Sequence, residues 1–429
     1  MKLLIKSGRV IDPLNEIDDQ LDILINNGRI TEVGKDLAAG KNDQVIDAQG
    51  KIVCPGFIDM HVHLRDPGYQ YKEEIASGAR AAAAGGFTTI CCMPNTKPVI
   101  DNASVAAYVR QMAAKTGIVN VLPIGAITKN QDGAEITEMA DPIAAGCIAV
   151  SDDGKPVEKA EIMRNALEYA KMFDLPVISH CEDTSLASDG QMHEGFYSTL
   201  YGFKGIPAAA EEVMAARDII LAKATGGHVH ICHISSKGTV DLIRKGKAEG
   251  VNVTCEVTPH HLTLTDEAVG TYDTNTKVNP PLRSPEHIQA LLEGINDGTI
   301  DCIVTDHAPH ELESKDCEYN LASFGISGLE TAIPLIMSLV GKHIDLNQMI
   351  SLFTAGPANV LGLNKGSIGI GDIADITILD PEKTKTVDPA NFYSKGKNTP
   401  YAGRELKGWP YMTIVNGKII AEDGRIIEE

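Results

Sequence analysis

The sequence predicts an α/β protein, a (β/α)8 barrel of the TIM type with a small β-sandwich domain beside it. Three observations lead to this fold class. Eight short apolar runs alternate with helical patterns between residues 54 and 364, and both flanks contain only short strand-like pieces. The chain of 429 residues is also long enough for one large domain and a smaller one.

The eight predicted barrel strands follow one another at the spacing of β-α units. They are residues 57–63, 87–93, 119–124, 147–150, 177–180, 229–233, 251–257 and 302–305. A helical pattern over 71–84 ends at Gly85-Gly86, and Ser284-Pro285-Glu286 is typical of a helix start with proline in the first turn. We therefore assign residues 54–364 to the barrel.

The two flanks share a different pattern. Strand-like pieces occupy 3–6, 21–25, 30–33 and 44–47 before the barrel, and 374–379, 411–415 and 418–420 after it. Asn27-Gly28 and Asn416-Gly417 are signals for hairpin turns. Because neither flank has many strands, we expect residues 1–53 to pair with 365–429 in one composite β-sandwich domain.

Composition excludes several classes of function. The net charge of −20 is spread along the chain, which argues against a nucleic-acid partner. No stretch approaches 18 uninterrupted apolar residues, and the first apolar run is too short for a signal sequence, so we expect a cytoplasmic protein without a membrane partner. Six of the nine cysteines lie in apolar runs without a Cys-x-x-Cys spacing, which predicts buried free thiols.

Polar residues gather at the carboxyl ends of the predicted strands, where barrel enzymes place their active sites. Buried side chains of this kind are costly unless they have partners. The residues are His61, His63, Asn95, Asp152, Asp153, His180, His233 and Asp306. The rim therefore predicts a functional site.

His61 and His63 are two positions apart on a strand, so both side chains leave the same face. Such a pair alone is a weak signal for a metal site and is more typical of paired core or surface histidines. With His180, His233, an aspartate near 153 and Asp306 added, the nitrogen and oxygen ligands exceed what one tetrahedral zinc ion needs. This set predicts two metal ions bridged by a carboxylate and a water.

Two bridged ions activate the water between them and polarise a carbonyl group, which predicts hydrolysis of an amide or ester. Asp306 is the candidate for the base that moves the proton. Arg65, two residues beyond His63, and His310 can supply donors for a carboxylate. A surface ion pair is the alternative for Arg65, but its position beside the histidines favours an acidic substrate.

The motifs that contain these residues resemble the amidohydrolase superfamily, and within it the type I dihydroorotases. The resemblance extends over essentially the whole chain. It is carried, in this order, by Asp59-Met60-His61-Val62-His63-Leu64-Arg65-Asp66-Pro67-Gly68, Met93-Pro94-Asn95-Thr96, Ser151-Asp152-Asp153-Gly154, Ser179-His180-Cys181-Glu182, His233-Ile234-Ser235, Pro259-His260-His261-Leu262, Asn279-Pro280-Pro281-Leu282-Arg283 and Thr305-Asp306-His307-Ala308-Pro309-His310.

The resemblance implies a role for each site residue. It implies that one zinc ion is held by His61, His63 and Asp306, the other by His180 and His233, and that Asp153 and a hydroxide bridge them. It implies that the substrate contacts His63, Arg65, Asn95, Asn279, His310, Phe324 and Gly325. Among these, Arg65, Asn95 and His310 would bind the carboxylate of dihydroorotate.

In the family, the reaction is the reversible cyclisation of N-carbamoyl-L-aspartate to L-dihydroorotate in pyrimidine (UMP) biosynthesis. Hydantoinase-like members bridge their metals with a carboxylated lysine from the fourth strand, whereas this chain has Ser151-Asp152-Asp153 there. Lys155 follows Gly154 in an expected loop. Chemistry alone leaves Asp152 and Asp153 open, and the resemblance favours Asp153.

Three alternatives remain beside this interpretation: another cyclic-amide hydrolase, a non-catalytic scaffold, and a metal-storage or binding barrel, which would not need Asp306 beside Arg65. An allantoinase or a dihydropyrimidinase is less favoured, because Arg65, Asn95 and His310 suit a substrate that carries a carboxylate. A non-catalytic scaffold for aspartate transcarbamoylase is expected to have lost metal ligands, and none is missing. A homodimer and a transcarbamoylase partner are left open. The polar stretch 310–320 is long enough for a flap over the site.

Overall fold

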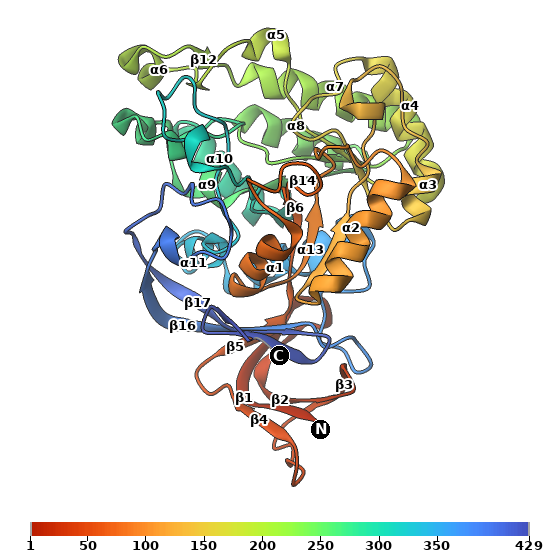
Figure 1. The fold of residues 1–429 in the computed structure, drawn as a ribbon, viewed down its shortest axis with the longest axis vertical. Helices are drawn as coiled ribbons and strands as arrows, with labels where there is room; N and C mark the ends of the chain where they lie inside the picture. Colours follow the sequence, from red (N-terminus) through yellow and green to blue (C-terminus); the bar gives the residue numbers. More distant parts are fainter. Residues whose placement is uncertain (1, 428–429) are drawn as a thin grey trace.

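Eight parallel strands form the centre of the computed structural model, which describes residues 2–427 (Figure 1). Every strand predicted between residues 57 and 305 is confirmed, with ends that differ by a few residues. The bounds are β6 (Phe57–Val62), β7 (Phe87–Cys92), β8 (Asn120–Pro123), β9 (Val150–Ser151), β10 (Val177–Ser179), β13 (Val229–Ile231), β14 (Val253–Val257) and β15 (Cys302–Ile303).

These strands pair in the order of the sequence. One parallel sheet contains β6, β7 and β8, and another contains β9, β10, β13, β14 and β15. Isolated parallel bridges join Gly125 to Val150 and Val62 to His307, so the end of the last strand returns to the first. All eight carboxyl ends therefore meet at one rim, on which the predicted site residues lie.

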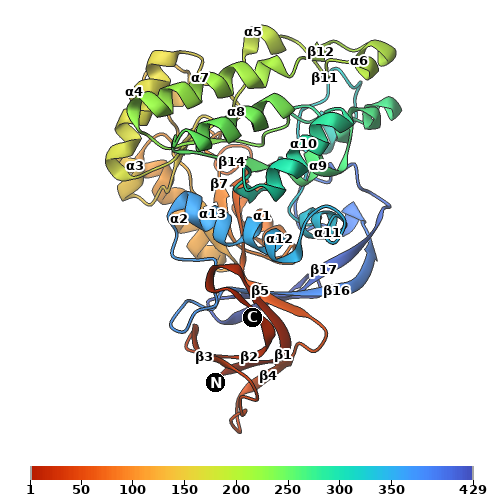
Figure 2. The ribbon, with the colours of Figure 1, turned by 180° about the vertical axis from the view of Figure 1, so that it is seen from behind.

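Helices surround the strands on their outer side (Figures 1 and 2). Their bounds are α1 (Ile75–Ala84), α2 (Ala103–Thr116), α3 (Ala140–Ala144), α4 (Ala160–Ala170), α5 (Thr184–Ala187), α6 (Phe196–Tyr201), α7 (Ala209–Thr225), α8 (Lys237–Ala248), α9 (Pro259–Thr263), α10 (Pro285–Asn296), α11 (Ala332–Met337), α12 (Leu346–Phe353) and α13 (Ala355–Leu361). A small parallel pair, β11 (Met192–His193) and β12 (Gly205–Ile206), lies outside the ring.

The signals for helix ends were mostly correct. Helix α10 begins at Pro285 with Ser284 as its N-cap, and α1 is followed by Gly85, both as predicted. The predicted start of α1 at residue 71 was wrong, because the chain is still in a turn there and Glu74 caps the helix. The preceding Glu73 is buried and hydrogen-bonded instead of facing solvent on a helix.

The flanks build a nine-stranded sheet at the other end of the molecule (Figure 1). Its strands are β1 (Leu3–Asp12), β2 (Ile17–Asn26), β3 (Arg29–Gly34), β4 (Gln44–Asp47), β5 (Ile52–Pro55), β16 (Ile376–Thr386), β17 (Glu405–Val415), β18 (Lys418–Glu422) and β19 (Arg425–Ile426). Strand β5 pairs with both β1 and β16, so hydrogen bonding is continuous from β19 to β3. The strands of both flanks therefore belong to one hydrogen-bonded sheet, and the sandwich form of this domain stays a prediction.

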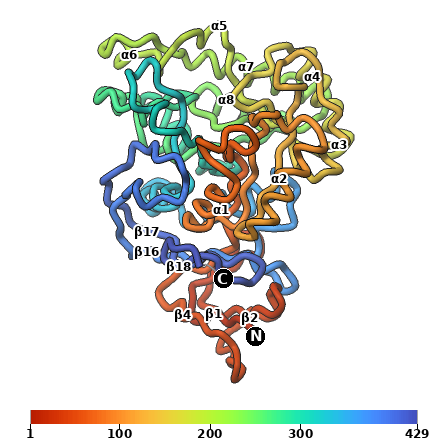
Figure 3. The backbone as a smooth tube through the Cα atoms, viewed as in Figure 1, coloured from red at the N-terminus to blue at the C-terminus, as the bar shows by residue number. Residues whose placement is uncertain are grey.

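The sheet encloses a core of its own, to which residues from both flanks contribute, including Ile5, Ile23, Ile376 and Ile414. In Figure 3, the first and last described strands both lie in this part of the molecule. The two predicted hairpin turns are present. Asn27-Gly28 and Asn416-Gly417 have positive φ at both positions, as the tight turn between twisted strands requires.

The connection from β16 to β17, residues 387–404, leaves the sheet and rises beside α11 towards α9 (Figures 1 and 2). Its middle part packs on the rim formed by the carboxyl ends of the eight strands, where Ser394, Asn398 and Tyr401 are buried. From the sequence, we assign all of residues 387–404 to the β-domain. The difference arises because a loop without apolar periodicity carries no signal for its distant partners.

The cysteines are free thiols, and eight of the nine are buried, as predicted. Several of them fill the inside of the ring together with residues such as Met60, Ile178 and Val304. Within residues 2–427, we find no helix with the length and apolar character that crossing a bilayer requires.

Candidate active site

Six of the predicted residues come together at the rim, although they are up to 245 positions apart in the sequence. His61 lies in β6 and His63 follows it; Asp153 follows β9, His180 follows β10, His233 follows β13 and Asp306 follows β15. All six are buried. Parallel strands deliver these side chains to one place because their carboxyl ends share one edge.

The first group of ligand atoms surrounds one point. Nε2 of His61 lies 3.3 Å from Oδ2 of Asp153 and 3.6 Å from Oδ1 of Asp306. Nε2 of His63 lies 3.3 Å and 3.0 Å from the same two oxygens. A tetrahedral ion with ligands about 2.1 Å away separates neighbouring ligand atoms by about 3.4 Å. The spacing therefore fits a single ion.

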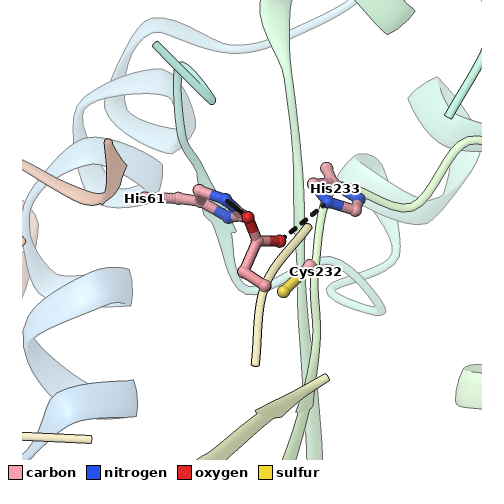
Figure 4. A group of neighbouring side chains, drawn as sticks. His61, Cys232 and His233 are labelled. Carbon is pink, nitrogen blue, oxygen red and sulfur yellow. Dashed lines mark ion pairs between the residues drawn. The ribbon is translucent and has the colours of Figure 1, made fainter. Parts of the chain in front are cut away.

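The second group uses the other oxygen of Asp153. Its Oδ1 lies 3.6 Å from Nδ1 of His180 and 3.4 Å from Nε2 of His233, and these two nitrogens are 3.0 Å apart. In Figure 4, His61 and His233 each form an ion pair with the carboxylate between them. The carboxylate of Asp153 thus faces both groups, which is the arrangement of a bridging ligand.

The residues present fit metal ions. Among the described residues, Nε2 of His61 and Oδ1 of Asp153 are buried and have no hydrogen-bond partner. Buried polar atoms are costly in this state, and a cation between them would satisfy both. Cys232 lies in the same group, but burial raises the pKa of its thiol, which keeps it protonated and a poor ligand.

The two aspartates stay ionised despite their surroundings. Burial pushes the pKa of Asp306 upwards, but the hydrogen bond from His63 and the charge of His61 outweigh it and hold the pKa below its usual range. Burial is likewise outweighed for Asp153, whose pKa is lowered by the charge of His61 and by the imidazoles of His180 and His233 beside its carboxylate. Both carboxylates are available as ligands and proton acceptors.

A second layer of residues orients the histidines. Nδ1 of His61 lies 2.5 Å from Oε1 of Glu256, whose other oxygen lies 3.1 Å from Nε2 of His230. Nδ1 of His63 lies 3.0 Å from Oδ1 of Asn95. Partners of this kind fix the tautomer and the ring angle of a metal-binding histidine. The sequence reasoning missed Glu256, although an acidic residue inside a buried strand was a usable signal.

A cavity of about 240 Å³ opens beside the ligand groups. Its wall contains every residue predicted to bind substrate, together with five of the six predicted ligands. His61 is the exception, because it lies beneath them with no exposed surface. The lining residues are His63, Arg65, Asn95, Asp153, Gly154, His180, His233, Val278, Asn279, Asp306, Ala308, His310, Phe324 and Gly325.

One side of the cavity is cationic. The Arg65 guanidinium is held by a hydrogen bond from Nε to the carbonyl of Pro309 at 3.4 Å. Lys72 donates to Nδ1 of His310, so the other ring nitrogen donates to the carbonyl of Phe324 at 2.9 Å. Burial lowers the pKa of His310 to about 2, and the charges of Arg65 and Lys72 add to this. His310 is therefore a neutral donor.

Asn279 lies across the cavity, where its Nδ2 donates to Glu182 at 3.1 Å. Glu182 in turn lies 3.5 Å from Nε2 of His180, so Asn279 is tied to the second ligand group. Sequence reasoning did not single out Glu182 for a role.

Three residues of the site have strained backbones. Arg65, His233 and Asp306 have φ values of 59°, 28° and 45°. L-residues rarely adopt this region, and such strain is concentrated at functional sites where the surroundings enforce it. Here it turns the side chains from the strand direction towards the cavity.

A larger hollow of about 940 Å³ lies away from this chemistry, between the sheet and α12. Its charged groups pair with one another, as Arg9 does with Asp18 and Lys407 with Glu382. We therefore place the function at the smaller cavity.

Comparisons with known proteins agree with this site. Residues 50–239 match the family model described as "Dihydro-orotase-like", and residues 326–421 match "Amidohydrolase family". The chain is 55% identical over 427 residues to a dihydroorotase of Pelotomaculum thermopropionicum, and 53% identical over 425 residues to one of Geobacter sp. strain M21. Each match covers 99% of this chain and at least 99% of the relative.

The chain belongs to the dihydroorotase family. Solved structures of related enzymes share its fold. An L-hydantoinase (dihydropyrimidinase) from Arthrobacter aurescens superposes with a TM-score of 0.90 at 25% identity, covering 100% of this chain and 97% of that one. A dihydropyrimidinase from Brevibacillus agri gives 0.87 at 22% identity, covering 100% and 96%. Family membership predicted from the motifs is thereby confirmed.

Proposed function

We propose that this chain is a metal-dependent dihydroorotase, which interconverts N-carbamoyl-L-aspartate and L-dihydroorotate. The observation that carries the proposal is the cavity, in which Arg65 and His310 face the cluster of histidines and aspartates. A cationic wall suits the substrate carboxylate, and the cluster suits the amide bond that opens or closes. The full-length relatives named dihydroorotase support the same reaction.

We assign the metal ligands from the two groups of atoms that face the two oxygens of Asp153. His61, His63 and Asp306 would hold one zinc ion, His180 and His233 the other, and Asp153 would bridge them. When bound, the ions would supply an activated water and polarise the carbonyl group. Zinc is favoured over harder ions, because four imidazole nitrogens dominate the donor set.

The residues of the chain then have two roles, proton transfer and substrate binding. In the hydrolytic direction, water adds to the carbonyl carbon of the cyclic amide, the C–N bond breaks, and the ring nitrogen needs a proton. Asp306, ionised beside the cavity, accepts the proton from the water and returns it to that nitrogen. Arg65 and His310 hold the ring through its carboxylate. Ring closure is the reverse sequence, in which Asp306 takes the proton from the attacking nitrogen.

Two features favour a dihydroorotase over a hydantoinase-like enzyme, although the two share a fold. Asp153 stands where hydantoinase-like enzymes have a carboxylated lysine, and Lys155 lies beyond it, with its Nζ donating to the carbonyl of Gln131 at 3.4 Å. An uncharged dihydropyrimidine would leave the half-buried guanidinium of Arg65 without an anionic partner, which is costly. The proposal therefore favours a substrate with a carboxylate.

We extend the proposal to the organisation of the molecule. Residues 54–364 would form a (β/α)8 barrel, and 1–53 with 365–429 a composite β-domain, of which the stretch around 394–401 covers the rim. A cytoplasmic location, a homodimer and an aspartate transcarbamoylase partner stay predictions. Size-exclusion chromatography of the purified chain, alone and with a transcarbamoylase, tests the assembly.

The test of the function compares three substrates. Zinc-loaded protein is incubated with dihydroorotate, dihydrouracil and allantoin, and ring opening is followed by absorbance and chromatography. We expect turnover of dihydroorotate, with kcat/KM about a hundredfold above that for the other two rings. Faster turnover of dihydrouracil or allantoin, or no turnover by protein that contains zinc, would refute the substrate assignment.

A further inference from the structure

The segment 394–401, from the connection between β16 and β17, is docked on the barrel rim as closely as a core element. Ser394, Asn398, Thr399 and Tyr401 are buried there. Gly396 allows the close approach, because a Cβ at this position would lie 2.5 Å from the Cβ of Pro309. The segment therefore presses against the chain between Asp306 and His310.

Both atoms of the Asn398 side-chain amide form hydrogen bonds with two loops of the active site. Its Oδ1 accepts from the backbone N–H of His310 at 3.0 Å and from the hydroxyl of Ser327 at 2.9 Å. Its Nδ2 donates to the carbonyls of Ala308 and Gly325, both at 3.0 Å. Its own carbonyl accepts from the N–H of Ser327 at 2.8 Å. The residue is 4% exposed.

The two loops carry the part of the cavity wall that lies beside Arg65. His310 lies on the first loop, and Phe324 and Gly325 lie on the second, where the Phe324 carbonyl accepts from His310. The loops already touch through a backbone hydrogen bond from Ala308 to Ile326 at 2.9 Å. Asn398 joins both to a third segment, so the separation of His310 from Gly325 depends on it.

We propose that Asn398 is a positioning residue, which sets the spacing of the two loops that hold the substrate carboxylate. Only an amide side chain of this size accepts two hydrogen bonds on one atom and donates two from the other. Aspartate would place an oxygen against the carbonyls of Ala308 and Gly325, and leucine would satisfy none of the four groups. The identity of the ligand rests on the proposed function, whereas the contact between the loops does not.

Two substitutions and a matched control test this role. Asn398→Asp keeps the volume and removes both donated hydrogen bonds, while Asn398→Ala removes all four. Asn391→Ala, in the same connection, removes an exposed amide that contacts only Asp388 among the described residues. Each variant is measured for zinc content, for kcat and KM with dihydroorotate, and for amide hydrogen exchange.

We expect Asn398→Asp and Asn398→Ala to raise KM about tenfold or more, with kcat changed by less than about threefold and the zinc content kept. The amide of His310 should exchange about tenfold faster in Asn398→Ala, because it donates to the Oδ1 that the substitution removes. The Asn391→Ala control should match the wild type in all three measurements.

Unchanged KM together with unchanged exchange at the His310 amide would overturn the proposal. So would a fall in kcat at constant KM, since that pattern belongs to a loss of folded enzyme. If the wild type does not convert dihydroorotate, the proposed function fails, and the exchange of the His310 amide still decides whether Asn398 holds the loops.

Discussion

Asp306 lies both beside the metal-ligand atoms and at the wall of the cavity, and a residue that carries a proton between water and substrate needs both contacts. Its Oδ1 lies among the ligand atoms, 3.0 Å from Nε2 of His63, and its carboxylate also lines the cavity. Its strained φ of 45° turns it away from the strand direction. A ligand that borders the substrate can pass a proton without a further residue.

Replacing Asp306 by asparagine should separate these two roles. We expect Asp306→Asn to keep much of the metal, since the other ligands remain, and to lose about a thousandfold in kcat, since an amide cannot accept the proton. Zinc analysis and steady-state kinetics check this. Asp174→Asn, at an exposed turn, is the control. A kcat within about tenfold of the wild type would remove Asp306 as the base.

Arg65 should act on one part of the substrate only. Arg65→Ala is expected to raise KM for dihydroorotate by about a hundredfold, because a charge-assisted contact to the carboxylate is lost. The effect on an uncharged cyclic amide should be small. Arg164→Ala, on the exposed face of α4, is the control. Equal effects on both substrates would argue against a carboxylate contact.

At this scale, the sequence was informative wherever a polar residue interrupts an apolar strand. His61, His180 and His233 were recognisable because burial makes such residues costly without a partner. Glu256 carried the same signal and was missed. Asn398 carried no signal, because a single amide in a loop gives no indication of which distant backbone groups it binds.

At the scale of elements, the loop between Asp306 and Phe324 is held in place by two lysine side chains that donate hydrogen bonds to backbone carbonyls. Lys315 donates to the carbonyls of Thr274 at 3.1 Å, Lys277 at 3.3 Å and Ser323 at 2.7 Å. Lys277 donates to the carbonyls of Tyr319 and Asn320. The predicted flap over residues 310–320 stays a prediction, and any opening has to break these contacts.

Removing the central lysine should release the loop. We expect Lys315→Met to make residues 311–323 about tenfold more sensitive to limited proteolysis, since three backbone carbonyls lose their shared donor. Fragment masses locate the cuts. Lys342→Met, at an exposed position, should leave the cleavage pattern unchanged. Equal cleavage of the two variants would show that Lys315 does not hold the loop.

Elements with strong local signals were predicted well, and those without them were not. All eight strands predicted between residues 57 and 305 were found, and even β9, only two residues long, begins at Val150, the last residue of its predicted run. The start of α1 was misplaced because Tyr71, Lys72 and Glu73 continue the helical pattern in sequence while Glu73 pairs with His307. A tertiary contact overrode the local preference there.

At the scale of the molecule, the connection 387–404 links the flanking sheet to the active site, because it leaves the sheet after β16 and packs on the rim before it returns to β17. Glu330, after the second active-site loop, accepts from the N–H groups of Tyr393 and Ser394 in that connection. The pairing of the flanks was predictable from their strand count. The return of one loop to the rim was not, because it depends on packing between residues about 70 positions apart.

Glu330 predicts a pH dependence of stability. Burial raises its pKa from 4.5 to about 8, although the two N–H groups favour the charged form. The folded state therefore holds the proton more tightly than the unfolded chain, and this contribution is lost as pH rises from 4.5 through about 8. Glu330→Gln should become progressively more stable than the wild type across this window.

Chemical unfolding at several pH values measures the difference. The free energy of unfolding of Glu330→Gln, minus that of the wild type, should rise with pH and level off above about 8. Glu313→Gln, at an exposed position, should show no such trend. A difference that is constant with pH would contradict a raised pKa at Glu330.

The central claim is that a two-metal site bridged by Asp153 opens and closes a ring that carries a carboxylate. Titration of metal-free protein with zinc, with dihydroorotate turnover recorded at each step, tests it most directly. We predict that turnover appears with zinc and is complete near two ions per chain, and that Asp153→Ala binds less zinc and is inactive. Full turnover without metal, or zinc-loaded protein that leaves dihydroorotate unchanged, would contradict it.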